Sequence, residues 1–169
     1  MTEQEIKTDV IVPDESDKQA DRIKQNHEAD KIVTRHTFYA AAAGLIPIPA
    51  VDIVAITGIQ LKMLASLSKN FDIPFAQNTG KHLIAALTGG AGHRALGGVA
   101  RSFAKAIPFV GQFIAPVSVS IIAGATTYAI GKVFTQHYAS GGTFLNFDPA
   151  AVKAYYEEQF EQGKTVAAP

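Results

Sequence analysis

The chain has 169 residues, of which 15 are Lys or Arg and 15 are Asp or Glu, so its formal net charge is zero. This balance argues against a protein that coats DNA or RNA. The absence of cysteine excludes disulfides, thiolate-bound zinc and cysteine nucleophiles.

Charged residues are only 18% of the chain, below the usual quarter, and they are unevenly distributed. Residues 1–30 hold nine acidic and four basic side chains, whereas residues 31–147 hold nine basic and two acidic ones. Residues 148–169 are acidic again, with four acids and two bases. The neutral average therefore hides a basic, apolar middle, which is suited to anionic lipid or an acidic partner.

In the first half of the chain, the sequence predicts a disordered acidic tail over residues 1–15, followed by two helices. Asp14 or Ser16 caps the first helix, which runs from polar sequence into the apolar stretch before Ile46. The Ile-Pro-Ile-Pro step at residues 46–49 ends this helix, because proline breaks the helical hydrogen bonds. The second helix is expected from Ala50 to about Asn70.

The second half predicts further helices and no strand, because no segment alternates cleanly between apolar and polar residues. Asp72 and Pro74 are expected to start a third helix that ends near Thr88. A fourth is expected over residues 93–105, a fifth over residues 112–138 with a kink at Pro116, and a last one over residues 150–162 behind Asp148 and Pro149. The predicted fold is all-α, with five to six helices in a single domain over residues 16–164 and a short disordered tail over residues 165–169.

Two long runs carry almost no charge. Residues 38–61 contain one charged side chain, Asp52, and residues 106–131 contain none. Both runs reach the roughly 20 residues that a helix needs to cross a bilayer, but prolines interrupt each of them. The sequence therefore predicts two proline-broken apolar helical hairpins whose tips insert into a membrane. The expected insertion residues are Ile46, Pro47, Ile48, Pro49, Ile107, Pro108, Phe109 and Val110.

The segment between the two runs is basic and is expected to lie on anionic lipid headgroups. Its basic residues are Lys62, Lys69, Lys81, Arg94, Arg101 and Lys105. Asp52 is a candidate polar site at membrane depth, or a carboxylate that simply offsets the positive end of the second helix. The first 30 residues have no apolar core, so no signal peptide is expected, and the predicted location is the cytoplasmic side of the inner membrane.

Recurring small residues on the fifth helix, such as Ser120, Gly124 and Gly131, suit either close helix pairing in a membrane or an Ala- and Gly-rich helix in a soluble bundle. The alternative to membrane insertion is thus a soluble all-helical protein-interaction bundle that buries both apolar runs.

No catalytic, metal or cofactor motif emerges. The Gly-rich stretch at residues 88–95 follows helical sequence and not a strand, so it does not meet the requirements of a dinucleotide site. The five histidines lack metal-ligand spacing, and the chain contains neither a phosphate-binding P-loop motif nor a serine-hydrolase motif. We expect a protein that is not an enzyme and that binds no cofactor.

Several segments together resemble the bacterial YcjF-type domain of unknown function. They are the stretch from Gly44 to Val54 with Gln60 to Met63, the stretches Ile107 to Gly111 and Thr127 to Gly131, and Gly141 to Phe144 with Asn146 to Asp148 and Tyr155-Tyr156. The resemblance covers residues 32–164. It implies a membrane-associated module that works beside a GTPase, here supplied in trans because this chain has no GTPase domain, and it transfers no catalytic residue. The expected partners are membrane lipid, a GTPase and a second copy of the chain, and not nucleic acid.

Overall fold

The computed structural model describes residues 14–46, 51–88 and 111–168, and the side chains of residues 51–53 and 111–118 are outside the description as well. Four helices carry labels: α1 (Glu15–Ala43), α2 (Val51–Asn70), α4 (Gly111–Ala139) and α5 (Lys153–Ala167). A further short helix covers residues 77–88. None of the described residues lies in a β-strand, so the predicted all-α fold is confirmed.

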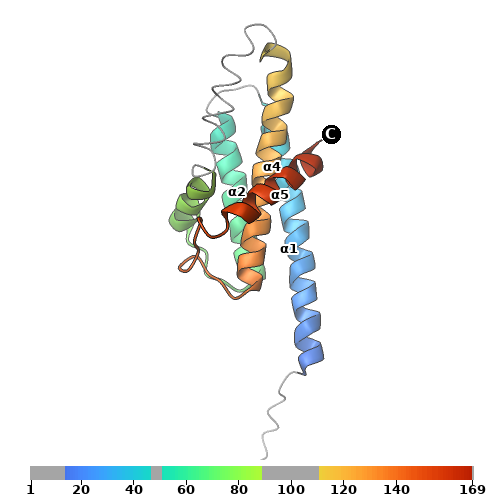
Figure 1. Cartoon of the computed structure of the whole chain (residues 1–169), viewed down its shortest axis with the longest axis vertical. Helices are drawn as coiled ribbons and strands as arrows, with labels where there is room; N and C mark the ends of the chain where they lie inside the picture. The colour runs from blue at the N-terminus through green and yellow to red at the C-terminus, as the bar shows by residue number, and fades with distance from the viewer. Residues whose placement is uncertain (1–13, 47–50, 89–110, 169) are drawn as a thin grey trace, which may run out of the picture.

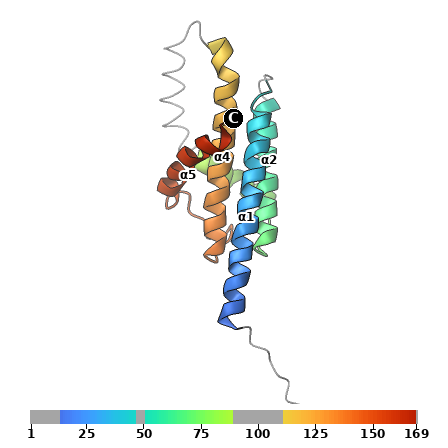
Figure 2. The ribbon, with the colours of Figure 1, turned by 90° about the vertical axis from the view of Figure 1, so that its right-hand side faces the viewer.

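The three long helices lie lengthwise beside one another (Figures 1 and 2). α2 runs antiparallel to α1, and α4 runs parallel to α2. The C-terminal end of α1 and the N-terminal ends of α2 and α4 are therefore at the same end of the bundle, and the shorter α5 crosses α4 obliquely. The N-terminal part of α1 extends beyond the opposite end of the bundle (Figure 2).

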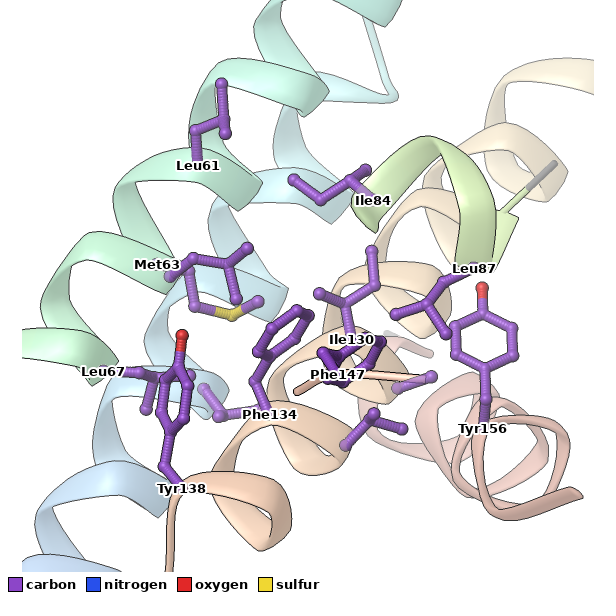
Figure 3. Close-up of a cluster of buried hydrophobic side chains, with 14 of the residues drawn as sticks. Leu61, Met63, Leu67, Ile84, Leu87, Ile130, Phe134, Tyr138, Phe147 and Tyr156 are labelled. Carbon is purple, nitrogen blue, oxygen red and sulfur yellow. The ribbon is translucent and has the colours of Figure 1, made fainter. Parts of the chain in front are cut away.

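The core forms where α1, α2 and α4 meet. Its fully buried side chains include Val33, Met63, Ile130 and Phe134, and Figure 3 shows Met63 and Phe134 directed toward each other between α2 and α4. Gly131 permits the close approach of the three helices, because a Cβ there would lie 2.6 Å from a Val33 methyl carbon and 3.1 Å from the Met63 sulfur. Val33, Met63 and Gly131 thus lie at one level of the bundle, the reference level.

Aromatic side chains close the bundle below this level. The Phe134 ring stacks on Phe147, with centroids 4.5 Å apart and planes 4° from parallel. Such a ring pair stabilises the fold by roughly 0.5–1.5 kcal/mol beyond the contribution of the surface area that it buries. Tyr138 lies against the same cluster, and its hydroxyl is 3.1 Å from the Ser68 hydroxyl of α2. The turn after α4 is therefore held onto the core through Phe144 and Phe147.

Small residues let α4 pack closely on α1. A Cβ on Gly44 would lie 2.8 Å from the Ser120 Cα, and a Cβ on Gly124 would lie 3.2 Å from the Ala41 Cβ. The Ser120 hydroxyl also donates a hydrogen bond of 2.7 Å to the Ala41 carbonyl. The small-residue spacing seen in the sequence is thus used for helix packing within this chain.

Two helix starts differ from the prediction. Asp72 does not open the third helix. It lies just after α2 with its backbone in the left-handed region, with φ at 55°. The Ile73 N–H donates a hydrogen bond of 2.8 Å back to the Ser68 carbonyl. This pattern is a helix C-terminal motif. Asp148 accepts a hydrogen bond of 2.9 Å from the Ala150 N–H, but residues 149–152 form turns and α5 begins only at Lys153.

Two other helix boundaries match the prediction, and one helix extends beyond it. α1 begins directly after Asp14 and α2 ends at Asn70, as predicted. α5 continues past the expected end at residue 162 to Ala167. The helix predicted over residues 93–105 and the second Ile-Pro step lie outside the described residues.

Candidate functional site

Most of the predicted insertion residues lie outside the described part of the chain, namely Pro47, Ile48, Pro49, Ile107, Pro108, Phe109 and Val110. So do the basic residues Arg94, Arg101 and Lys105. Asp52 belongs to the first turn of α2, but its side chain is not among those described. Ile46, Lys62, Lys69 and Lys81 are described, and all four are exposed.

The structure brings the described parts of the two apolar runs to one end of the bundle. We define the uncharged end as residues 37–46 of α1 and the turn after it, 54–61 of α2 and 119–131 of α4, none of which is Asp, Glu, Lys or Arg. Its helices end on the same side of the bundle (Figure 1). The two runs, distant in sequence, therefore contribute to a single uncharged structure.

Large apolar side chains are exposed on this end. On α1 and the turn after it they are Phe38, Tyr39, Leu45 and Ile46; on α2 the residue is Val54, which is 73% exposed; on α4 they are Val119 and Ile122. Small and polar residues of the same runs face inward. Ala40, Ala41 and Ala123 are buried. The Gln60 amide on α2 donates a hydrogen bond of 3.2 Å to the Thr127 hydroxyl of α4. The uncharged end is thus packed inside and apolar outside.

Along α1, α2 and α4, the first charged side chains below the uncharged end are all basic. α5 packs on Ala125 of α4 through Gly163 and carries the Glu161–Lys164 ion pair beside this end. Arg35 is two residues from Val33 on α1, Lys62 is next to Met63 on α2, and Lys132 is next to Gly131 on α4. Since Val33, Met63 and Gly131 meet at the reference level, the three basic residues lie within about a helical turn of one another along the bundle axis. We call this ring of positions the basic level.

The three basic residues differ in their partners. The Lys132 Nζ lies 2.8 Å from an Asp30 carboxylate oxygen on α1, and this pair raises the pKa of Lys132 against the opposing effect of burial. Among the described side chains, neither Arg35 nor Lys62 takes part in an ion pair. Both are exposed.

His36 is buried between the uncharged end and the basic level, with only 2% of its surface exposed. Its Nδ1 is 2.7 Å from the Ile32 carbonyl, which can only accept, so Nδ1 carries the proton. Burial lowers the pKa of His36, and the positive charges of Arg35 and Lys62 lower it further. The neutral ring is therefore favoured inside the bundle.

The two other described basic residues of the predicted headgroup set differ in their position. Lys69 is in the last turn of α2, roughly 27 Å along the helix from Val51 and thus far from the uncharged end. Lys81 is on the short helix over residues 77–88, next to Gly80, where a Cβ would lie 3.3 Å from the side chain of Leu61. Sequence reasoning also missed Arg35, because it searched only the segment between the two runs. Arg35 could have been identified from the sequence as the basic residue that directly precedes the first uncharged run.

Comparisons with known proteins assign the family. Residues 15–165 match the family described as a domain of unknown function, DUF697. The chain belongs to the DUF697 family. The resemblance to a bacterial domain of unknown function is thereby confirmed.

A curated relative also matches this DUF697 chain. The two sequences are 42% identical over 149 residues, which cover 88% of this chain and 76% of the relative. The relative is Magnetosome membrane protein 22 of Magnetospirillum gryphiswaldense (strain DSM 6361 / JCM 21280 / NBRC 15271 / MSR-1). No solved structure matches the chain.

The described residues of this DUF697 chain contain neither a candidate membrane span nor a candidate metal cluster. No described helix combines the length and the apolar character that a bilayer span requires. No cluster of three or more His, Asp or Glu side chains with metal-binding geometry occurs in the described ranges.

Proposed function

We propose that this chain is a non-enzymatic, membrane-associated helical module that inserts the uncharged end of its bundle into a lipid bilayer on the cytoplasmic side of the inner membrane. The single observation that carries the proposal is the uncharged end itself, where exposed apolar side chains from three stretches of α1, α2 and α4 without a charged residue gather. Asp52, in the first turn of α2, and the Glu161–Lys164 ion pair of α5 lie outside these stretches.

The physical support is the cost of leaving these side chains in water. Val54, Phe38 and Leu45 are each more than half exposed, and full burial of a side chain of this size contributes roughly 1.5–3 kcal/mol. Helices are suited to the task, because their backbone hydrogen bonds are satisfied internally and need no water. The inner face of the uncharged end is already packed, so insertion would require no unfolding.

The relative adds support of a different kind. A protein 42% identical over most of this chain is named as a magnetosome membrane protein. That name concerns the relative and its own membrane. We extend only the coarse property, association with a bilayer, to this chain.

The alternative is a soluble bundle that binds another protein, for example a GTPase supplied in trans or a second copy of the chain. The observation that favours it is that both runs also pack inside the bundle, where Ala40, Ala123 and Ala129 are buried. In this alternative a partner's apolar surface, and not lipid, would cover Val54 and its neighbours.

Vesicle flotation with matched variants tests the proposal. Val54→Asp adds a charge to the uncharged end, whereas Leu145→Asp adds the same charge to a side chain that is 96% exposed in the turn after α4. An acidic side chain in the membrane interior costs about 2.5–3.5 kcal/mol, so Val54→Asp should weaken vesicle binding about 100-fold. Leu145→Asp should bind like the wild type.

The same experiment separates the two candidate functions. Wild-type protein that remains in the soluble fraction at low salt, without detergent and without floating, would rule out membrane insertion. A loss of binding that is equal in Val54→Asp and Leu145→Asp would also count against the uncharged end. Pull-down of a GTPase by the wild type but not by Val54→Asp would then favour the protein-interaction bundle.

A further inference from the structure

We infer that Arg35 of α1 and Lys62 of α2 together bind the phosphate groups of anionic lipid headgroups, at the level where the uncharged end begins. This inference rests on the proposed membrane association, and it adds a lipid class and a binding site to it.

The geometry brings the two residues to the same height on adjacent antiparallel helices. Val33 and Met63 both contact the position of Gly131, and Arg35 and Lys62 lie two and one residues from them, each toward the uncharged end. His36, beside Arg35 on α1, is close enough to both charges for each to lower its pKa. Arg35 and Lys62 thus form one positive region across the α1–α2 pair.

No acidic side chain in the described part of the chain neutralises this region. Lys132 at the same level is paired with Asp30, but no described acidic side chain pairs with Arg35 or Lys62. The sequence contains no Asp or Glu between Lys31 and Val51, and none between Ile53 and Phe71. The positive charge remains available for an external anion, and a guanidinium beside an ammonium is well suited to phosphate oxygens.

The distance from this region to the end of the helices matches the thickness of one leaflet. α1 continues from Arg35 to Ala43, and α2 extends from Lys62 back to Val51, which corresponds to about 12 and 17 Å of helix. Half of a hydrocarbon core of about 30 Å is about 15 Å. Insertion of the α1–α2 end would therefore bring Arg35 and Lys62 to the headgroups, with the long side chains extending into the interface.

The aromatic residue at this boundary agrees with the same depth. Tyr39 is exposed one turn above Arg35, and its ring meets the edge of His36 with centroids 5.8 Å apart. Tyrosine is enriched at membrane–water interfaces, where its ring is in apolar surroundings and its hydroxyl is hydrated. Along α1, the charged Arg35, the aromatic Tyr39 and the apolar Leu45 thus follow one another toward the end of the bundle in the order expected for an interface.

The test compares two double variants that remove the same charge from the same two helices. Arg35→Gln/Lys62→Gln removes the proposed site. Lys31→Gln/Lys69→Gln removes two exposed basic residues that lie further from the uncharged end, one on α1 and one on α2. Both are assayed by flotation with vesicles of pure phosphatidylcholine and with vesicles that also contain phosphatidylglycerol.

Wild-type protein should bind the phosphatidylglycerol vesicles more tightly than the neutral ones. Each basic residue near an anionic surface contributes about 1 kcal/mol, so Arg35→Gln/Lys62→Gln should bind them about 30-fold more weakly. Its binding to neutral vesicles should be unchanged, and the control variant should lose less than about threefold. Raising the salt concentration to 0.5 M should reduce the difference, because the Debye length then falls to roughly 4 Å.

Two results would overturn the inference while the proposed function stands. One is equal binding of both vesicle types by the wild type; the other is equal weakening of the two double variants, which would indicate attraction by overall charge without a site. If wild-type protein binds neither vesicle type, the proposed function fails and the headgroup site fails with it. Thermal unfolding of each variant shows whether the bundle is intact.

Discussion

Gly163 and Gly58 both lie inside helices, but their surroundings are different. A Cβ on Gly163 of α5 would lie 2.9 Å from both the Cα and the carbonyl oxygen of Ala125, which are backbone atoms of α4 that cannot move aside. A Cβ on Gly58 of α2 would meet nothing within 4 Å. The glycine at 163 is therefore required by the α4–α5 crossing, whereas no contact with the described residues requires the one at 58.

Alanine substitutions should consequently change stability in opposite directions. Gly163→Ala should lower the free energy of unfolding by about 1–3 kcal/mol through overpacking. Gly58→Ala should raise it by about 0.5–1 kcal/mol, because alanine loses less backbone entropy in a helix. Urea unfolding of the two variants measures both changes. Equal behaviour of the two variants would show that α5 does not pack closely on α4.

His36 makes stability depend on pH. Burial lowers the pKa of its ring in the folded state, with Arg35 and Lys62 adding to the effect, whereas the unfolded chain has a pKa near 6.5. As the pH falls through about 6.5, the unfolded chain takes up a proton before the folded chain does. The stability from a neutral His36 is therefore fully present above that pH and is lost toward the lower, folded-state pKa.

Comparison of two histidine variants tests this sign. The urea midpoint of the wild type should fall more between pH 7 and pH 5 than that of His36→Gln, which has no proton to take up at this position. His82→Gln, on an exposed histidine of the helix over residues 77–88, should keep the wild-type pH dependence. A pH dependence that is identical in the wild type and in His36→Gln would contradict the assignment.

Helices α2 and α4 are joined by a buried polar contact as well as by apolar packing. The Gln60 amide donates a hydrogen bond of 3.2 Å to the Thr127 hydroxyl. This hydroxyl in turn donates a hydrogen bond of 2.8 Å to the Ala123 carbonyl of its own helix. Both side chains are buried. A buried polar group that loses its partner keeps its desolvation cost, so the pair is sensitive to changes on one side only.

A double-mutant cycle measures this coupling. Thr127→Val should destabilise the protein by about 1–3 kcal/mol, because the Gln60 amide is left without its acceptor. Gln60→Leu together with Thr127→Val should destabilise less than the sum of the two single changes. Additive single changes would indicate that α2 and α4 do not depend on this hydrogen bond.

Helix-breaking and capping residues in the sequence predict most of the helices. The boundaries that were predicted wrongly depend on tertiary contacts. The sequence places the end of α2 at Asn70, as found, and the Ile46-Pro47 step lies three residues beyond the end of α1 at Ala43, because proline acts locally to stop a helix. Asp72 was expected to begin a helix and instead ends one, since an aspartate that caps and an aspartate in the left-handed region have the same local sequence signal. The extension of α5 to Ala167 depends on the contact of Gly163 with Ala125, which the sequence does not show.

At the scale of the whole molecule, the sequence identifies the uncharged runs but not how they are divided between packing and exposure. Composition alone cannot show that Ala40 is buried while Phe38 is exposed, because that depends on where α4 lies. Nor can it show that Arg35 is level with Lys62, since their alignment depends on the register of two antiparallel helices. The structure combines both facts into one molecule with an uncharged end, a basic level and a polar remainder.

The order of these regions predicts a depth profile along α2. The chain has no cysteine, so single cysteines at Val54, Lys62 and Lys69 can each carry a fluorescent label without a competing thiol. On phosphatidylglycerol-containing vesicles, the label at 54 should be quenched by a quencher in the acyl chains and the label at 62 by a quencher in the headgroups. The label at 69, about 10 Å further along the helix, should be quenched only from the aqueous phase.

This profile separates insertion along the bundle axis from other ways of binding a membrane. If the bundle lay flat on the surface, all three labels would respond to the headgroup quencher, because α2 would then be parallel to the bilayer. If a protein partner covered the uncharged end, the label at 54 would be shielded from the aqueous quencher and insensitive to the quencher in lipid. Only entry with the uncharged end first gives three different depths in the order 54, 62 and 69, because that order follows the direction of α2 from the uncharged end toward its C-terminus.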